Sequence, residues 1–200
     1  KSCDLNTLQC ELQTFGGQDI TKFGSRISVN NEGTIIYISD SRNGNLVGLS
    51  LTPAGNAYNI GAEVRRCQDV ASPTLRSQVM HATGVEVSLD NSNIIYISSS
   101  IQHAIQKLTL TDTTCTVVTS IGTGARDISK NVGTGTPATI DADDVGFDRP
   151  WGLNFVRSIA NPGNTRILTA TGRGYVDVFD EDRFTDANRD TAWLQNMGGP

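Results

Sequence analysis

The chain has 200 residues, of which 37% are hydrophobic and 18% are charged, and its formal net charge is −5. This length and hydrophobic content predict a folded chain with a core of its own. The acidic balance argues against nucleic acid or an anionic membrane surface as the partner. No stretch approaches the roughly 20 apolar residues that a membrane-spanning helix needs, so membrane insertion is not expected.

The cysteine content predicts disulfide bonds. Cys3, Cys10, Cys67 and Cys115 make an even number, and none of them has the spacing of a zinc ligand to another cysteine or to a histidine. Disulfides persist in oxidising compartments, so we expect an extracellular or cell-surface protein. Four buried reduced thiols are the alternative.

The sequence contains an internal repeat. Residues 35–39, Ile-Ile-Tyr-Ile-Ser, recur as residues 94–98 at an offset of 59, and residues 46–51 match the second copy at the same offset. Residues 29–32 then lie over residues 88–91. The register is therefore expected to hold without a gap from the first strand of each copy to the third.

Each copy indicates four short strands, because β-branched and aromatic segments alternate with turns rich in Asn, Gly, Pro and Asp. A partial copy comes first, since residues 10–16 match the fourth strand of the second copy. The predicted strands are residues 26–29, 34–39, 46–51 and 57–60 in the first full copy, 84–89, 94–99, 104–110 and 115–121 in the second, and 150–155, 166–170 and 175–179 in the third.

Four-stranded antiparallel units that repeat in this way predict an all-β fold, a β-propeller whose blades are the repeats. A β-sandwich would not return the same four-strand pattern in register. About three and a half blades are visible, fewer than a closed propeller needs, so we expect an arc of a longer protein. The predicted domain comprises a partial blade at 1–22, blades at 23–61, 84–122 and 150–180, connections at 62–83 and 123–149, and a blade end or linker at 181–200.

The start of the third blade carries a recognisable motif. Residues 133–138 supply a glycine-rich connection, residues 147–153 read Phe-Asp-Arg-Pro-Trp-Gly-Leu, and residues 36–40 read Ile-Tyr-Ile-Ser-Asp. These segments resemble NHL-repeat propellers, although residues 79–85 of the second blade lack the proline. The resemblance implies a portion of a six-bladed propeller of the extracellular type. Proteins of this type include binding modules, structural domains and a few lyases or hydrolases.

The resemblance also directs attention to the central channel, where related lyases hold zinc on histidines. This chain has two histidines, His81 and His103, whereas a catalytic zinc needs three protein ligands, so no zinc site is expected from these residues alone. Lys22, His81 and Arg149 fall at matching blade starts. They are candidates for a basic rim of the channel, and solvated surface charges are the alternative.

Two acidic clusters are candidates for calcium. Asp141, Asp143 and Asp144 crowd one blade connection, with Asp148 nearby, and residues 186–190 resemble the start of a calcium loop. The second cluster lacks the glycine and the bidentate glutamate that complete such a loop. Exposed polar loops are the alternative for both, and no cofactor is predicted.

The repeat also places the cysteines. Cys3 and Cys10 flank a hairpin of the partial blade, and we predict a cross-strand bond between them. Cys115 starts a fourth strand, whereas Cys67 follows one, so this pair is expected toward opposite faces of the propeller. They pair only if the connection after the first blade folds along the outer edge. Otherwise one of them bonds to another part of the protein.

The residues show well-specified strands and no catalytic motif, which favours a non-enzymatic extracellular module. Its expected partners are other proteins or further domains of the same polypeptide. Self-assembly into a larger adhesive or filamentous cell-surface structure is a further expectation, because the open strand edges of an incomplete propeller invite pairing. The alternative is a propeller enzyme of the lyase or lactonase type, with metal ligands partly outside this stretch.

Overall fold

The protein is built from short antiparallel strands, seen here in a computed structural model. The structure describes residues 2–4, 9–11, 24–40, 44–67, 81–112, 114–122, 147, 149–157, 165–170, 176–185, 188 and 193–197. Within these ranges the strands form one two-stranded sheet and three four-stranded sheets.

In each four-stranded sheet the strands pair with their neighbours in the sequence. Blade I consists of β3 (Gly24–Val29), β4 (Ile35–Asp40), β5 (Asn45–Ala54) and β6 (Ala57–Cys67). Blade II consists of β7 (Gly84–Val87), β8 (Ile94–Ser99), β9 (Ala104–Leu110) and β10 (Cys115–Ile121). Blade III consists of β11 (Gly152–Arg157), β12 (Thr165–Ala170), β13 (Val176–Asp180) and β14 (Trp193–Met197). A 3-10 helix, η3 (Glu181–Arg183), follows β13, and β1 (Ser2–Asp4) pairs with β2 (Gln9–Glu11) near the N-terminus.

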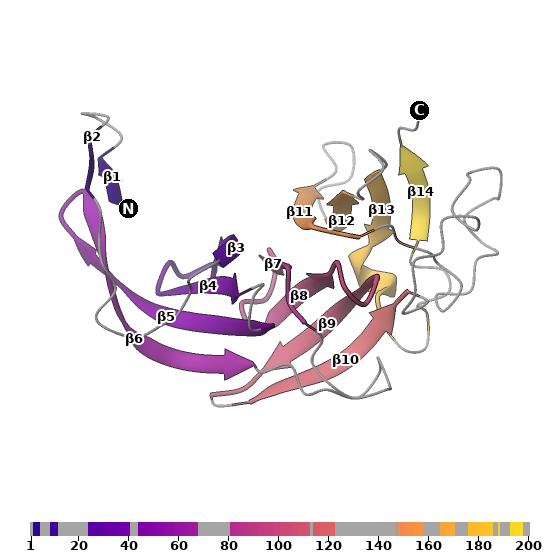
Figure 1. Ribbon diagram of the computed structural model, residues 1–200, viewed down its shortest axis with the longest axis horizontal. Coiled ribbons are helices and arrows are strands. Elements are labelled where there is room, and N and C mark those ends of the chain that lie inside the picture. Colours follow the sequence, from indigo (N-terminus) through magenta and orange to yellow (C-terminus); the bar gives the residue numbers. More distant parts are fainter. Residues whose placement is uncertain are drawn as a thin grey trace.

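The blades meet through their first strands. β3 contacts β7, and β7 contacts β11, so the first strand of each blade is the innermost and the fourth is the outermost. Figure 1 shows the sheets following one another along an arc. Antiparallel four-stranded sheets in this radial order define a β-propeller. The predicted fold is therefore confirmed, and the chain forms part of a β-propeller.

The repeat between blades I and II contains a one-residue insertion. Val29 pairs with Ile36 in blade I, and Val87 pairs with Ile95 in blade II. The first strands thus correspond at an offset of 58 and the second strands at 59, because the turn between β7 and β8 is one residue longer than the turn between β3 and β4. The predicted gapless register is wrong for the first strand and the turn that follows it.

Two outer strands extend the predicted pattern. β6 continues to Cys67, beyond the predicted end at residue 60, because β5 is also long and the two form one hairpin around Gly55, which has a positive φ of 63°. β14 lies in the region expected to be a blade end or linker, and it pairs with β13 as the fourth strand of blade III.

A disulfide joins Cys67 to Cys115, with 5.6 Å between their Cα atoms, and so links the outermost strands of blades I and II. The expectation that this pair lies toward opposite faces is wrong, because β6 carries Cys67 back along β5, where it pairs with Leu46. The register of β1 and β2 sets Cys3 opposite Cys10, as the predicted bond requires. The side chains of that second pair lie outside the described part, so their bond stays a prediction.

The core fills the spaces between blades. Between blades I and II, Tyr37 packs with the apolar face of β7, β8 and β9. Between blades II and III, Tyr96 makes edge contacts with Phe155 and Phe184, each at 5.4 Å between ring centroids. Burial of one large apolar side chain contributes about 1.5–3 kcal/mol, so these inter-blade clusters hold the blades in a fixed order.

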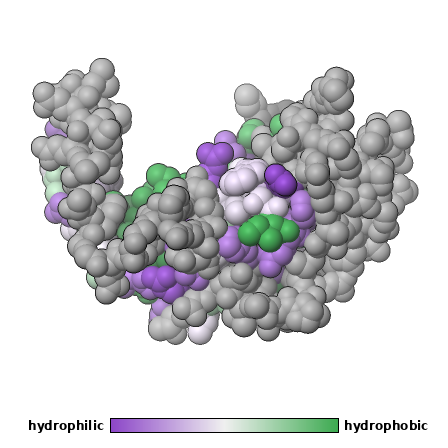
Figure 2. Space-filling view, viewed as in Figure 1, coloured by the Kyte–Doolittle hydropathy of each residue, from purple (hydrophilic) through white to green (hydrophobic). Residues whose placement is uncertain are grey.

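The face of blade I that points away from blade II is partly open. Ile27 and Val29 on β3 are 63% and 44% exposed, and Figure 2 shows apolar surface over this part of the blade. They alternate with Ser28, which pairs with Tyr37 on the opposite, buried face. Among the described residues, no helix has the length and hydropathy needed to cross a membrane.

Candidate functional site

The predicted channel rim is described only in part. Lys22 lies outside the described residues. His81 and Arg149 both lie at blade starts: the backbone N–H of His81 donates to Gln102 Oε1 at 2.9 Å, and the backbone nitrogen of Arg149 lies 3.3 Å from His103 Nδ1. The turn before β9 therefore contacts both blade starts. A role of these side chains as a channel rim stays a prediction.

The histidines do not assemble a metal centre with other described residues. Nδ1 of His103 lies 3.0 Å from the carbonyl oxygen of Phe147 and 3.3 Å from the backbone nitrogen of Arg149, so backbone groups surround this nitrogen. In the described part of the chain, no three His, Cys, Asp or Glu side chains gather as ligands. The calcium candidates Asp141, Asp143 and Asp144 lie outside that part, as does Asp148.

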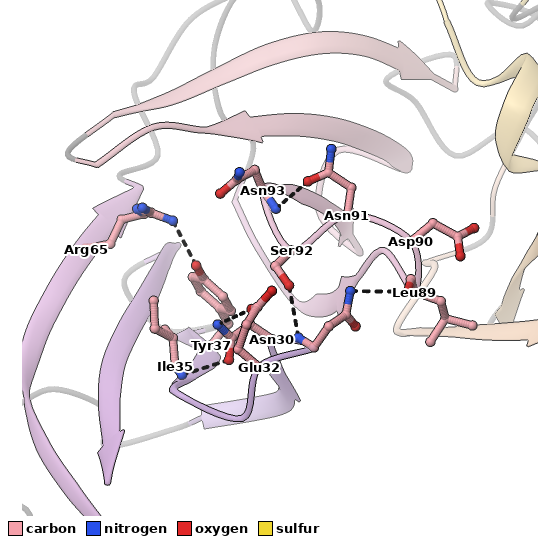
Figure 3. Close-up of a pocket in the computed structure, with 11 residues that line it drawn as sticks. Asn30, Glu32, Ile35, Tyr37, Arg65, Leu89, Asp90, Asn91, Ser92 and Asn93 are labelled. Atoms are coloured by element: carbon pink, nitrogen blue, oxygen red, sulfur yellow. Dashed lines mark hydrogen bonds between the residues drawn. The ribbon is translucent and has the colours of Figure 1, made fainter.

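A cleft with a volume of about 530 Å³ lies between blades I and II, at the edge where the first strand of each blade turns into the second. We call it the inter-blade cleft. Figure 3 shows the residues that line it, which come from both turns and from β4 and β6. They are Asn30, Asn31, Glu32, Ile35, Tyr37, Arg65, Leu89, Asp90, Asn91, Ser92 and Asn93.

The blade I turn is held by Asn30, which is only 8% exposed. Its Oδ1 accepts the backbone N–H groups of Thr34 and Ile35, both at 2.8 Å, and its Nδ2 donates to Glu32 at 2.8 Å. Gly33 completes the turn with a positive φ of 68°, a conformation that glycine adopts without strain. The carboxylate of Glu32 is therefore held over the cleft by the turn itself.

Asn31 joins the two turns. Its backbone N–H donates to Ser92 Oγ at 3.0 Å, and its Nδ2 donates to the carbonyl oxygens of Ser88 and Leu89 at 3.0 and 3.2 Å. Its amide thus fixes the spacing of the blades on this side. On the blade II turn, Asn91 Oδ1 accepts the backbone N–H of Asn93, so a short turn presents both asparagines at the surface.

The end of the cleft toward β6 is formed by Tyr37 and Arg65, which both pair with Gly48 of β5 in the sheet. A Cβ atom on Gly48 would lie 3.0 Å from Cε1 of Tyr37, so glycine lets the tyrosine ring cross β5 closely. The ring directs its hydroxyl to Arg65, whose Nη1 donates to it at 2.8 Å. Burial raises the pKa of Tyr37, although the guanidinium acts against this, so the hydroxyl stays protonated.

The guanidinium of Arg65 has few protein partners. Its Nε is buried and has no hydrogen-bond partner, and none of the described carboxylates forms an ion pair with it. The next residue, Arg66, is by contrast paired with Glu63 through two hydrogen bonds. Arg65 is therefore the cation of the inter-blade cleft that is available for an anion.

A similar cluster of a tyrosine and charged side chains lies between blades II and III. Tyr96 occupies in blade II the place of Tyr37 in blade I, and its hydroxyl donates to the buried carboxylate of Glu181 at 3.0 Å. Lys107, paired with Tyr96 across the sheet, lies 5.6 Å from the ring centroid. Burial raises the pKa of Glu181 and lowers that of Lys107, while their mutual attraction opposes both changes. This interface thus combines a tyrosine, a cation and a carboxylate.

Glu86 lies on β7, the innermost strand of blade II. Burial raises its pKa to about 7, and a hydrogen bond with Ser28 of blade I partly opposes the rise. Ser28 also accepts the backbone N–H of Val87 at 3.1 Å. The inner edge of the two blades therefore holds a carboxyl group that gains and loses its proton near neutral pH.

Comparison with known proteins finds only distant structural similarity. No protein-family model and no curated protein sequence matches the chain. Hydrazine synthase of Kuenenia stuttgartiensis gives a TM-score of 0.48 at 12% identity, over 92% of this chain and 39% of that chain. Periplasmic gluconolactonase of Pseudomonas aeruginosa gives 0.47 at 12% identity, over 90% of this chain and 46% of that chain. The chain spans less than half of either protein, and similarity at this level does not bear on its activity.

The sequence did not reveal the cleft. The sequence predicts only turns at the residues of the two blade edges, and it places Arg65 in a connection rather than in a strand. A signal was present: both turns are rich in Asn and acidic residues at corresponding places in two blades. Their proximity to Arg65 depends on the full length of β6, which the strand prediction missed.

Proposed function

We propose that this chain is part of an NHL-like, extracellular β-propeller that binds other proteins through the inter-blade cleft. The cleft is the observation that carries the proposal. It lies at an edge of the propeller, is lined mainly by amide, hydroxyl and charged side chains, and is built on turns that the strands hold in place. Sites that recognise partners are commonly formed in this way, by loops on a rigid scaffold.

The rigidity of the walls supports this proposal. Asn31 and the Cys67–Cys115 disulfide both connect blades I and II, one at the cleft and the other at the outer edge. A cleft with fixed walls loses little conformational entropy when a partner binds, which favours affinity. The disulfide also supports an oxidising compartment.

Selection of peptides from a displayed library of random 12-residue sequences tests the proposal directly. Asn93→Trp would fill the cleft from an exposed position, and Asp112→Trp places the same side chain on an exposed turn outside it. We expect peptides selected on the wild type to bind Asn93→Trp at least about tenfold more weakly and to bind Asp112→Trp unchanged.

Two results would contradict the proposal. Equal binding of the selected peptides to both tryptophan variants would place recognition elsewhere on the protein. Zinc- or calcium-dependent hydrolysis of gluconolactone by the protein would instead favour a propeller enzyme.

A further inference from the structure

The two inter-blade interfaces differ in one charged group. Between blades II and III, the hydroxyl of Tyr96 meets the Glu181 carboxylate beside the Lys107 cation. Between blades I and II, the hydroxyl of Tyr37 meets the Arg65 guanidinium, and none of the described carboxylates pairs with that cation. The two tyrosine hydroxyls thus meet charged groups of opposite sign.

We infer that the inter-blade cleft receives a carboxylate of the bound protein against Arg65, from an extended segment that contains Asp or Glu. This inference rests on the proposed protein-binding function. A half-buried guanidinium is costly unless it is paired, and a carboxylate accepts charge-assisted hydrogen bonds from it. Nη1 donates to Tyr37 and Nε is buried, so the N–H groups of Nη2 are the ones that donate to the carboxylate.

The rest of the cleft suits a peptide main chain. The amides of Asn91 and Asn93 lie on an exposed turn, and each amide offers a donor and an acceptor in the geometry of a peptide group. Figure 3 shows Arg65 at one end of the cleft and Asp90 at the other, with the asparagines between them. An extended segment along this line places its acidic side chain at Arg65.

The charges of the cleft favour one carboxylate over a polyanion. Glu32 and Asp90 line the same cleft as Arg65, and the whole chain carries a net charge of −5. A densely sulfated glycan would meet repulsion from both carboxylates along its length, whereas a peptide with one acidic side chain can place that side chain at Arg65 and neutral groups beside Glu32 and Asp90. The partner is therefore an acidic peptide segment.

Binding of the selected peptides to Arg65 variants tests this inference. We expect the enriched peptides to share one Asp or Glu, and Arg65→Gln to weaken their binding about ten- to a hundredfold, the usual range for a lost charge-assisted pair. Arg65→Lys should fall between Arg65→Gln and the wild type. Arg66→Gln is the matched control, because Arg66 is paired with Glu63 and does not line the cleft. The same peptides with the acid replaced by its amide should bind the wild type and Arg65→Gln equally.

A second measurement separates the carboxylate site from the protein-binding function. The Nε–H signal of Arg65 in nitrogen-15 NMR spectra should shift on addition of N-acetyl-aspartate methylamide and not with the asparagine analogue. If that shift occurs but no peptide is enriched, the carboxylate site stands and the protein-binding function fails. If peptides bind the cleft with no acidic preference, or bind Arg65→Gln as well as the wild type, this inference fails alone. Arg65-dependent binding of a heparan sulfate fragment without binding of acidic peptides would also overturn it.

Discussion

The bond between Cys67 and Cys115 gives a prediction whose size follows from the fold. The two cysteines are 48 residues apart, and the enclosed segment contains three strands of blade II. The loop-entropy relation for a loop of this length gives a stabilisation of about 4 kcal/mol. Because Cys67 is only 2% exposed, alanine is the appropriate replacement, since serine would bury a hydroxyl group.

The double variant Cys67→Ala with Cys115→Ala is compared with the wild type by urea unfolding, followed by circular dichroism. A loss of about 4 kcal/mol corresponds to a midpoint lower by about 2 M when the slope is about 2 kcal/mol/M. Thr116→Ala, an exposed change on the same strand, should alter the free energy of unfolding by less than about 0.5 kcal/mol. A loss below about 1 kcal/mol in the double variant would refute the loop-entropy reasoning.

Three further substitutions test how contacts within and between the blades contribute to the free energy of unfolding. Burial raises the pKa of Glu86 from 4.5 to about 7, so the folded protein holds this proton more tightly than the unfolded chain does, and stability falls as pH rises from about 4.5 to about 7. Glu86→Gln should reduce this fall in urea midpoints measured across that range, and an unchanged pH profile would contradict the assignment. Tyr96→Phe removes the hydroxyl donor of the buried Glu181 carboxylate, and urea unfolding should show a loss of about 1–3 kcal/mol, whereas a neutral result would mean that the carboxylate finds another donor. Gly84→Ala would bring a Cβ within 2.5 Å of the carbonyl oxygen of Trp151, and thermal unfolding should show a loss of about 1–3 kcal/mol unless blade III can move aside.

Most strands can be predicted from the sequence, because the pattern of β-branched residues and the turn-forming residues indicate the same strand boundaries. The second, third and fourth strands of blade II begin and end at the predicted residues, since β-branched residues recur in each strand and Asn or Asp marks the turns before the second and the fourth. The fourth strand of blade III was less visible. β14 contains no β-branched residue and follows a polar segment, so its pairing with β13 depends on tertiary contacts rather than on local preference.

The two errors of the sequence prediction, in the register of the first strand and in the length of β6, have physical causes that the repeat alone does not show. A turn one residue longer does not disturb the match of the second and third strands, so the gapless alignment that fits those strands shifts the first strand by one residue. A long outer strand has few neighbours that limit its length, and the polar end of β6 therefore resembled a connection. That same error concealed both the partner of Cys67 and the position of Arg65.

The Cys67–Cys115 bond also determines how the chain would carry a pulling force. Tension applied to its two ends passes from β6 to β10 through the sulfur atoms, and the segment that contains β7, β8 and β9 bears no load along its backbone. At about 3.5 Å per residue, the 48-residue separation corresponds to about 170 Å of chain that stretching cannot release while the bond is intact. Reduction of this one bond would make that length extensible.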